Sequence, residues 1–120
     1  MDPVIATSPI EIGTTEDIGR DLPSLAGGRP LVIDYFASRH GGLTVGDITV
    51  RFADAELEPH YVEIIPVSGV RVLAERHLIG LLADGASLAW APHLMGRHLA
   101  IRLARPERWI AFLESHPRSH

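Results

Sequence analysis

The 120-residue sequence contains no cysteine and no lysine. Without cysteine the chain has no disulfide, no thiolate nucleophile and no thiolate ligand for a metal. Every one of its 11 basic residues is an arginine, so a Schiff-base lysine and the phosphate-binding lysine of a P-loop are both missing. These two absences exclude several large classes of enzyme.

Long apolar runs and concentrated positive charge are missing as well. The longest apolar runs are far shorter than the roughly 20 residues that a membrane-spanning helix needs, so we expect no membrane association. The net charge is -4 and the arginines are scattered, which argues against a nucleic-acid partner. The first ten residues place no positive charge before an apolar region, and we therefore expect a cytoplasmic protein.

The composition fits one soluble globular domain. Apolar residues make up 46% of the chain and charged residues 22%, which are ordinary proportions for a globular protein with a single core. We expect residues 1–120 to form one domain, with an N-terminal arm at 1–8 and a flexible tail at 116–120.

The first half of the sequence predicts four strands and a helix. Alternating apolar residues predict strands at 9–12, 31–38, 47–52 and 61–65. A threonine followed by two acids predicts a helix that begins near residue 15 and continues weakly past Pro23 to residue 25. The strand at 31–38 should be buried on both faces, and residues 39–42 should interrupt it.

Residues 69–90 read as strand, short helix, turn and strand. Val70 and Val72 alternate with polar neighbours, whereas Leu78, Ile79 and Leu82 recur at the spacing of a helix face. Residues 91–97 should form a loop, 98–104 a strand, and 106–116 a helix. The resulting order, β-α-β-β-β-β-α-β-β-α, predicts an α+β domain with a mostly antiparallel mixed sheet, or a small sandwich, covered by short helices.

Several stretches resemble the HesB-like family, which includes the A-type iron-sulfur cluster carriers. The opening strand and helix at 9–22, the strand that runs into Gly41 and Gly42, and the segment 69–90 are similar to parts of that family, and together they span roughly residues 9–105. The resemblance implies a carrier-type fold. It also implies a ligand set of one cysteine in the glycine-flanked loop and two cysteines near the C-terminus.

This chain departs from the family at those ligands. His40 stands where the loop cysteine would be, and His116 and His120 stand in the tail where the paired cysteines would be. A thiolate-ligated iron-sulfur cluster is therefore excluded. Either a histidine-based metal site survives or the scaffold has lost its metal.

The first hypothesis is that His40, His116 and His120 bind a divalent metal ion such as iron or zinc, with Glu114 as a further ligand, since neutral imidazole suits both metals. Pro117 lies between the two tail histidines and prevents a regular helical pair, so a tail without a metal role is the alternative. On this reading the chain is a small HesB-like binding protein that also engages a partner protein.

Two further hypotheses come from other classes of function. A metal-free dimeric interaction module would use an exposed strand edge or the apolar loop at residues 94–95. A small enzyme would use Asp34 as a general base beside His40. For Asp34 the structural alternatives are an acid on a partly exposed face or one held by a cation.

Overall fold

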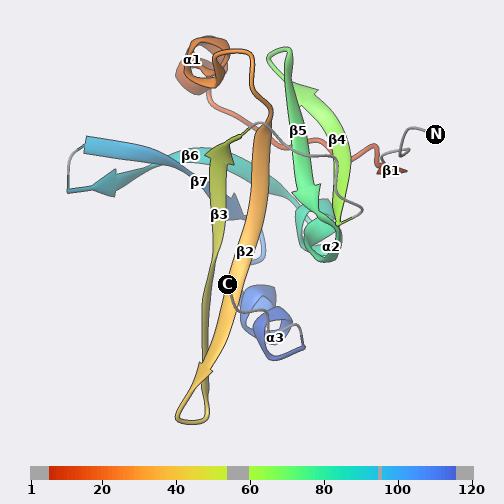
Figure 1. Ribbon diagram of the computed structural model, residues 1–120, viewed down its shortest axis with the longest axis vertical. Helices are drawn as coiled ribbons and strands as arrows, with labels where there is room; N and C mark the ends of the chain where they lie inside the picture. The colour runs from red at the N-terminus through yellow and green to blue at the C-terminus, as the bar shows by residue number, and fades with distance from the viewer. Residues whose placement is uncertain (1–5, 54–59, 95, 116–120) are drawn as a thin grey trace.

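The computed structural model describes residues 6–53, 60–94 and 96–115 as two β-sheets with short helices (Figure 1). The larger sheet has five strands in the order β1-β4-β5-β2-β3, and the smaller sheet pairs β6 with β7. β1 is parallel to β4 and β2 is parallel to β5, whereas the other neighbours are antiparallel. The strands are β1 Ala6–Thr7, β2 Leu31–His40, β3 Leu43–Phe52, β4 Tyr61–Val67, β5 Val70–Glu75, β6 Ala86–His93 and β7 Gly96–Leu103.

The predicted α+β class and the predicted order of strands and helices are confirmed. The helices are α1 Glu16–Ala26, the 3-10 turn η1 Arg76–Leu78, α2 Ile79–Ala83 and α3 Glu107–Ser115. Pro23 lies inside α1, and the helix ends at Gly27, whose positive φ of 58° gives the left-handed cap that glycine favours. No helix among the described residues is long and apolar enough to cross a membrane.

β2 and β3 form a long hairpin that runs almost the full height of the molecule (Figure 1). The register is unbroken from the pair Leu31 and Phe52 to the pair His40 and Leu43. The predicted interruption at 39–42 was therefore wrong. Gly41 and Gly42 have φ values of 56° and 86°, and two successive positive φ values build a tight two-residue turn without ending either strand.

The segment that follows β1 connects the two sheets. The amide of Ser8 donates to the carbonyl of Glu63 in β4, while Gly13 exchanges backbone hydrogen bonds with Ala86 and Leu88 of β6. The strand predicted at 9–12 was wrong, because this stretch crosses from one sheet to the other instead of pairing along one neighbour. The short strand lies before it, in the predicted N-terminal arm.

β6 and β7 form a two-stranded ribbon that extends away from the five-stranded sheet (Figure 1). The ribbon continues through most of residues 91–97, so the loop predicted there was wrong. Pro92 is tolerated in β6 because β7 is its only partner strand among the described residues, and the bridge to Gly13 on the other edge lies at Ser87, away from Pro92. Leu94, beside the turn, is fully exposed.

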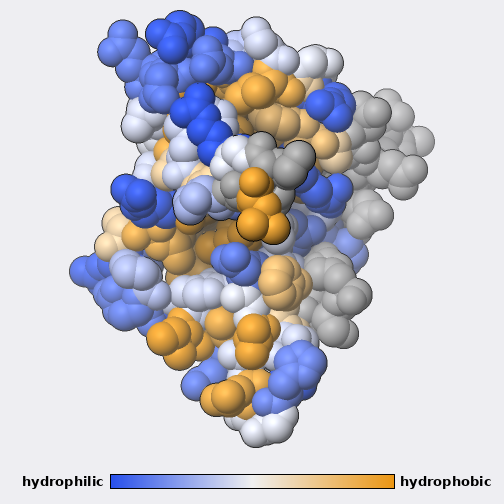
Figure 2. All heavy atoms as spheres, turned by 90° about the vertical axis from the view of Figure 1, so that its left-hand side faces the viewer, coloured by the Kyte–Doolittle hydropathy of each residue, from blue (hydrophilic) through white to orange (hydrophobic). Residues whose placement is uncertain are grey.

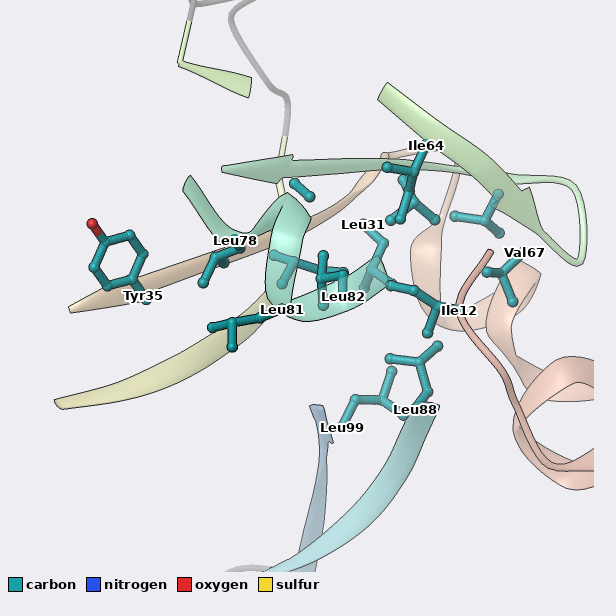
Figure 3. Close-up of a cluster of buried hydrophobic side chains, with 14 of the residues drawn as sticks. Ile12, Leu31, Tyr35, Ile64, Val67, Leu78, Leu81, Leu82, Leu88 and Leu99 are labelled. Carbon is teal, nitrogen blue, oxygen red and sulfur yellow. The ribbon is translucent and has the colours of Figure 1, made fainter. Parts of the chain in front are cut away.

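The core lies between one face of the five-stranded sheet, the ribbon and the helices, and Figure 3 shows its central part. α1 contributes Ile18 and Leu22, which have no exposed surface. Leu78 and Leu82 are also buried, as the predicted helix face requires. We call this face of the sheet the inner face. Along each strand, the side chains between those of the inner face point to the opposite side of the sheet, which we call the outer face. Asp34 and Glu75 are among them.

Candidate functional site

Two acids are buried on the outer face, side by side on the neighbouring strands β2 and β5. Asp34 is 5% exposed and Glu75 is 2% exposed, and among the described residues they are the only buried charged side chains. In the parallel pair of β2 and β5, Ile33 is level with Ala74, so Asp34 and Glu75 follow at the same height. Tyr61 of β4 pairs with Glu75 across the next strand boundary.

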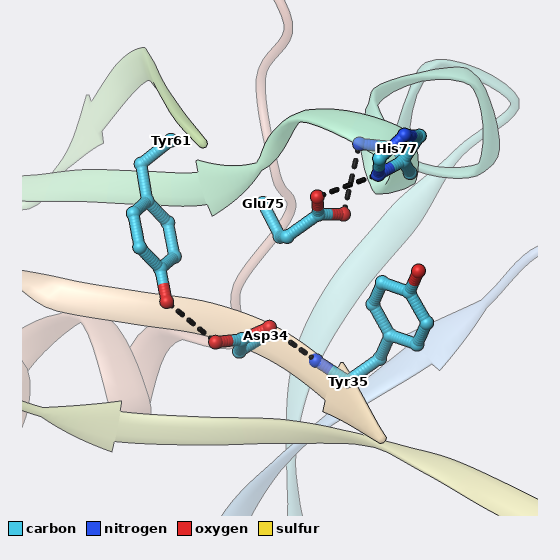
Figure 4. Close-up of polar contacts among 5 residues, drawn as sticks. All are labelled: Asp34, Tyr35, Tyr61, Glu75 and His77. Atoms are coloured by element: carbon cyan, nitrogen blue, oxygen red, sulfur yellow. Dashed lines mark hydrogen bonds and ion pairs between the residues drawn. The ribbon is translucent and has the colours of Figure 1, made fainter. Parts of the chain in front are cut away.

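Asp34 is held by a phenol and by a backbone amide (Figure 4). The hydroxyl of Tyr61 donates to Oδ2 at 2.5 Å, and the amide of Tyr35 donates to Oδ1 at 2.8 Å. An acid in an apolar strand needs such donors, because a buried carboxylate without them costs several kcal/mol. The partner is thus a tyrosine, whereas the sequence analysis considered a cation.

Glu75 binds both the backbone and the ring of His77 (Figure 4). One carboxylate oxygen accepts from the amide of His77 at 2.8 Å and caps η1, and the other lies 2.7 Å from His77 Nδ1. A buried carboxylate at this nitrogen fixes the orientation of the imidazole. Such a pair can support proton transfer or ligand binding, and here it also terminates β5.

His40 lies far from Asp34. Both are on β2, but they are six residues apart in a continuous strand, which sets their Cα atoms about 20 Å apart at roughly 3.3 Å per residue. The structure therefore does not bring these two residues together as an acid and a base. His40 is exposed beside the hairpin turn, and its Nε2 lies 3.1 Å from the hydroxyl of Ser38.

The C-terminal end of α3 lies next to this turn. Glu114 and Leu113 line a cavity of about 420 Å³ together with Arg39, Gly42 and Leu43. Figure 2 shows apolar side chains exposed among polar ones at this lower end of the molecule. His116 and His120 lie outside the described residues. In sequence, however, His116 directly follows Ser115, the last residue of α3.

Of the three predicted histidine ligands, only His40 lies within the described residues. Within residues 6–53, 60–94 and 96–115, no three histidine, aspartate or glutamate side chains are grouped closely enough to hold a metal ion. A site at His40 thus depends on the tail histidines.

Two carboxyl groups on the surface have lowered pKa values. Bidentate hydrogen bonds from Arg71, at 3.1 and 3.0 Å, lower the pKa of Glu63 on the outer face of β4. The hydroxyl of Thr15 lowers the pKa of Asp17 in α1, and the indole of Trp90 adds a hydrogen bond at 3.1 Å. The hydrogen bonds between Arg71 and Glu63 join β5 to β4, and the hydrogen bond between Trp90 and Asp17 joins the ribbon to α1.

Comparisons with family models, curated proteins and solved structures find no match for this chain. Functional interpretation therefore depends on its own residues. The sequence analysis missed the contact between Glu75 and His77, although the spacing of acid and histidine at the end of a buried strand was a usable signal. It also missed Tyr61, because nothing in the sequence places it beside Asp34.

Proposed function

We propose that this chain is a small non-enzymatic binding protein of the HesB-like type that binds a divalent metal ion, iron or zinc, at the His40 end of the molecule. His40, His116 and His120 are the proposed ligands, with Glu114 as a further ligand. Imidazole nitrogens and one carboxylate oxygen form a ligand set that suits both metals.

The observation that carries this proposal is the cavity shared by the hairpin turn and the end of α3. Gly42 and Leu43 line it from the turn, and Glu114 lines it from the helix. His40 immediately precedes the turn, and His116 comes two residues after Glu114 in the sequence. The side chain of His40 shares the outer face of β2 with Ser38, so Arg39 and not His40 lines the cavity itself. Two histidines that are 76 positions apart in the sequence are thus attached to neighbouring parts of the fold.

Calorimetric titration of the untagged protein with Zn²⁺ and with Fe²⁺ tests this site. We expect saturable binding, and we expect His40→Ala or His116→Ala to weaken it at least about tenfold, because each variant removes a metal ligand. His60→Ala is the matched control, since His60 is an exposed histidine at the start of β4 and away from α3. Equal binding by the His40, His116 and His60 variants would contradict the proposal.

A second candidate function, homodimerisation through the edge strand β3, is favoured by its charges. Asp47 and Arg51 lie on the outer face of β3, two residues on either side of Thr49. If a second copy pairs antiparallel about a two-fold axis at Thr49, Asp47 of each chain lies opposite Arg51 of the other. Opposite charges in directly paired positions stabilise a sheet by roughly 0.2–1 kcal/mol per pair.

Charge exchange tests this dimer. We expect light scattering to report a dimer for the unmodified chain, and Asp47→Arg to shift it to a monomer by placing like charges opposite each other. The double variant Asp47→Arg with Arg51→Asp restores opposite pairs and should restore the dimer. A monomer at all concentrations of the unmodified chain would exclude this second function and leave the metal proposal unaffected.

A further inference from the structure

A second cavity lies between β3, β7 and the start of α3, at the opposite end of that helix from Glu114. Its volume is about 440 Å³, within the range of roughly 300–1,000 Å³ typical of sites for small organic ligands. Most of its lining residues are apolar, and two exposed residues of opposite charge complete the wall. The residues that matter here are Ile48, Ile101, Leu103, Trp109, Asp47 and Arg102.

The aromatic wall of this cavity is fixed by its neighbours. The ring of Trp109 is stacked on Phe112, with 5.3 Å between centroids and 17° between planes. It also meets the ring of Tyr35 edge-on at 6.2 Å. Phe112 and Tyr35 are buried in the core, so the indole is held in place before any ligand arrives. A preorganised wall reduces the entropy lost on binding.

The two charged residues of the cavity differ in their contacts. The carboxylate of Asp47 accepts a hydrogen bond from the amide of Ile48 at 2.8 Å. The side chain of Arg102 takes part in none of the ion pairs or side-chain hydrogen bonds of the described residues. The guanidinium is therefore the charged group able to receive a ligand, and its planar donors suit a carboxylate, sulfonate or phosphate.

We propose that this cavity binds a small organic anion with an apolar ring or short chain. The apolar body packs against Ile101, Leu103 and Trp109, and the anionic group binds Arg102. This site uses none of the proposed metal ligands, so it goes beyond the metal-binding function. Failure of either proposal would leave the other unaffected.

Fluorescence with a matched pair of probes tests the proposal. Anilinonaphthalene sulfonate carries the anionic group, and phenylnaphthylamine has the same rings without it. The sequence has two tryptophans, so Trp90→Phe leaves Trp109 as the single reporter. We expect saturable binding of the sulfonate that quenches Trp109. Arg102→Ala should weaken binding of the sulfonate about tenfold, the scale of one charge-assisted hydrogen bond, and leave the neutral probe unchanged.

Two variants make the outcome decisive. Arg20→Ala removes an exposed arginine of α1 that does not line the cavity, and it should leave binding of both probes unchanged. Ile101→Phe fills the cavity and should weaken both probes, with circular dichroism showing that the fold is retained. The proposal is overturned if the sulfonate does not bind saturably, if Arg102→Ala and Arg20→Ala have equal effects, or if the folded Ile101→Phe protein binds as before.

Discussion

At the residue scale, the hydrogen bond from Tyr61 to Asp34 accounts for an acid inside an apolar strand. The two residues are 27 positions apart, and the carboxylate is 5% exposed. Sequence analysis identified Asp34 as unusual but could not name its partner, since the contact depends on β4, β5 and β2 being neighbours in that order. A buried polar contact of this kind specifies strand order as well as stabilising it.

Replacing Tyr61 with phenylalanine should lower the free energy of unfolding. The change keeps the ring and removes a donor to a buried carboxylate, so we expect a loss of about 1–3 kcal/mol. Urea unfolding monitored by circular dichroism measures it. In a double-mutant cycle with Asp34→Asn, the two changes should be coupled. Additive effects would show that the hydroxyl does not act through Asp34.

At the scale of single elements, α3 approaches the β2–β3 hairpin very closely at one glycine, Gly46. A Cβ atom at Gly46 would lie 2.6 Å from Leu113 Cδ2 and would also contact the carbonyl of Phe36. Both contacts would be far shorter than an ordinary van der Waals contact. The helix can therefore approach the hairpin this closely only because position 46 has no side chain.

Gly46→Ala should therefore destabilise the protein by at least about 2 kcal/mol, because the helix or the strand must shift. Gly80→Ala provides the matched control, since a Cβ there meets nothing within 4 Å and the residue lies in α2. Alanine in a helix is favoured over glycine, so that variant should be unchanged or up to about 1 kcal/mol more stable. Thermal unfolding of the two proteins makes the comparison, and equal stabilities would rule out this packing.

The pair formed by Glu63 and Arg71 joins β4 to β5 and makes a prediction for acid pH. The pKa of Glu63 is lowered from its ordinary value of 4.5 in the folded state, so the pair stabilises the protein above that pH. The contribution is lost as pH falls through the lower, folded pKa. Because both side chains are partly exposed, with 25% and 49% of their surface accessible, it should not exceed about 1 kcal/mol.

Arg71→Gln should thus be less stable than the unmodified chain at pH 7, and the difference should shrink as pH falls below 4.5 through the lowered pKa of Glu63. Urea unfolding across this pH range measures the difference. Arg105→Gln, at an exposed arginine whose side chain makes no ion pair with a described residue, should show no such convergence. A difference for Arg71→Gln that stays constant with pH would mean that the arginine acts through packing rather than charge.

Periodicity predicted the elements well and their ends poorly. The alternation in β2 and the helical spacing of Leu78 and Leu82 come from burial, which a sequence pattern records directly. The ends were missed at residues 39–42 and 91–97, because glycines and a proline predict loops there. In the fold, two glycines form a tight turn and the proline lies in a strand that has a partner strand on one side only.

At the scale of the whole molecule, the candidate sites are distributed over separate regions. The buried acids lie in the middle of the five-stranded sheet, the proposed anion cavity at the start of α3, and the His40 turn at the end of the long hairpin. The sequence analysis predicted His40 as a site residue from its glycine-flanked position. It could not show that Glu114 shares a cavity with the turn, because that contact depends on how α3 packs against the hairpin.

The most direct test of the account is the metal content of the untagged protein. The protein is purified without chelator, reconstituted separately with iron and zinc, desalted and measured by elemental analysis. If the proposed histidine site exists, we expect about one metal ion per chain, or one per dimer if two chains share a site. That metal should be lost in His40→Ala but not in His60→Ala. Metal no higher than in a blank, or equal metal in both variants, would contradict the proposal.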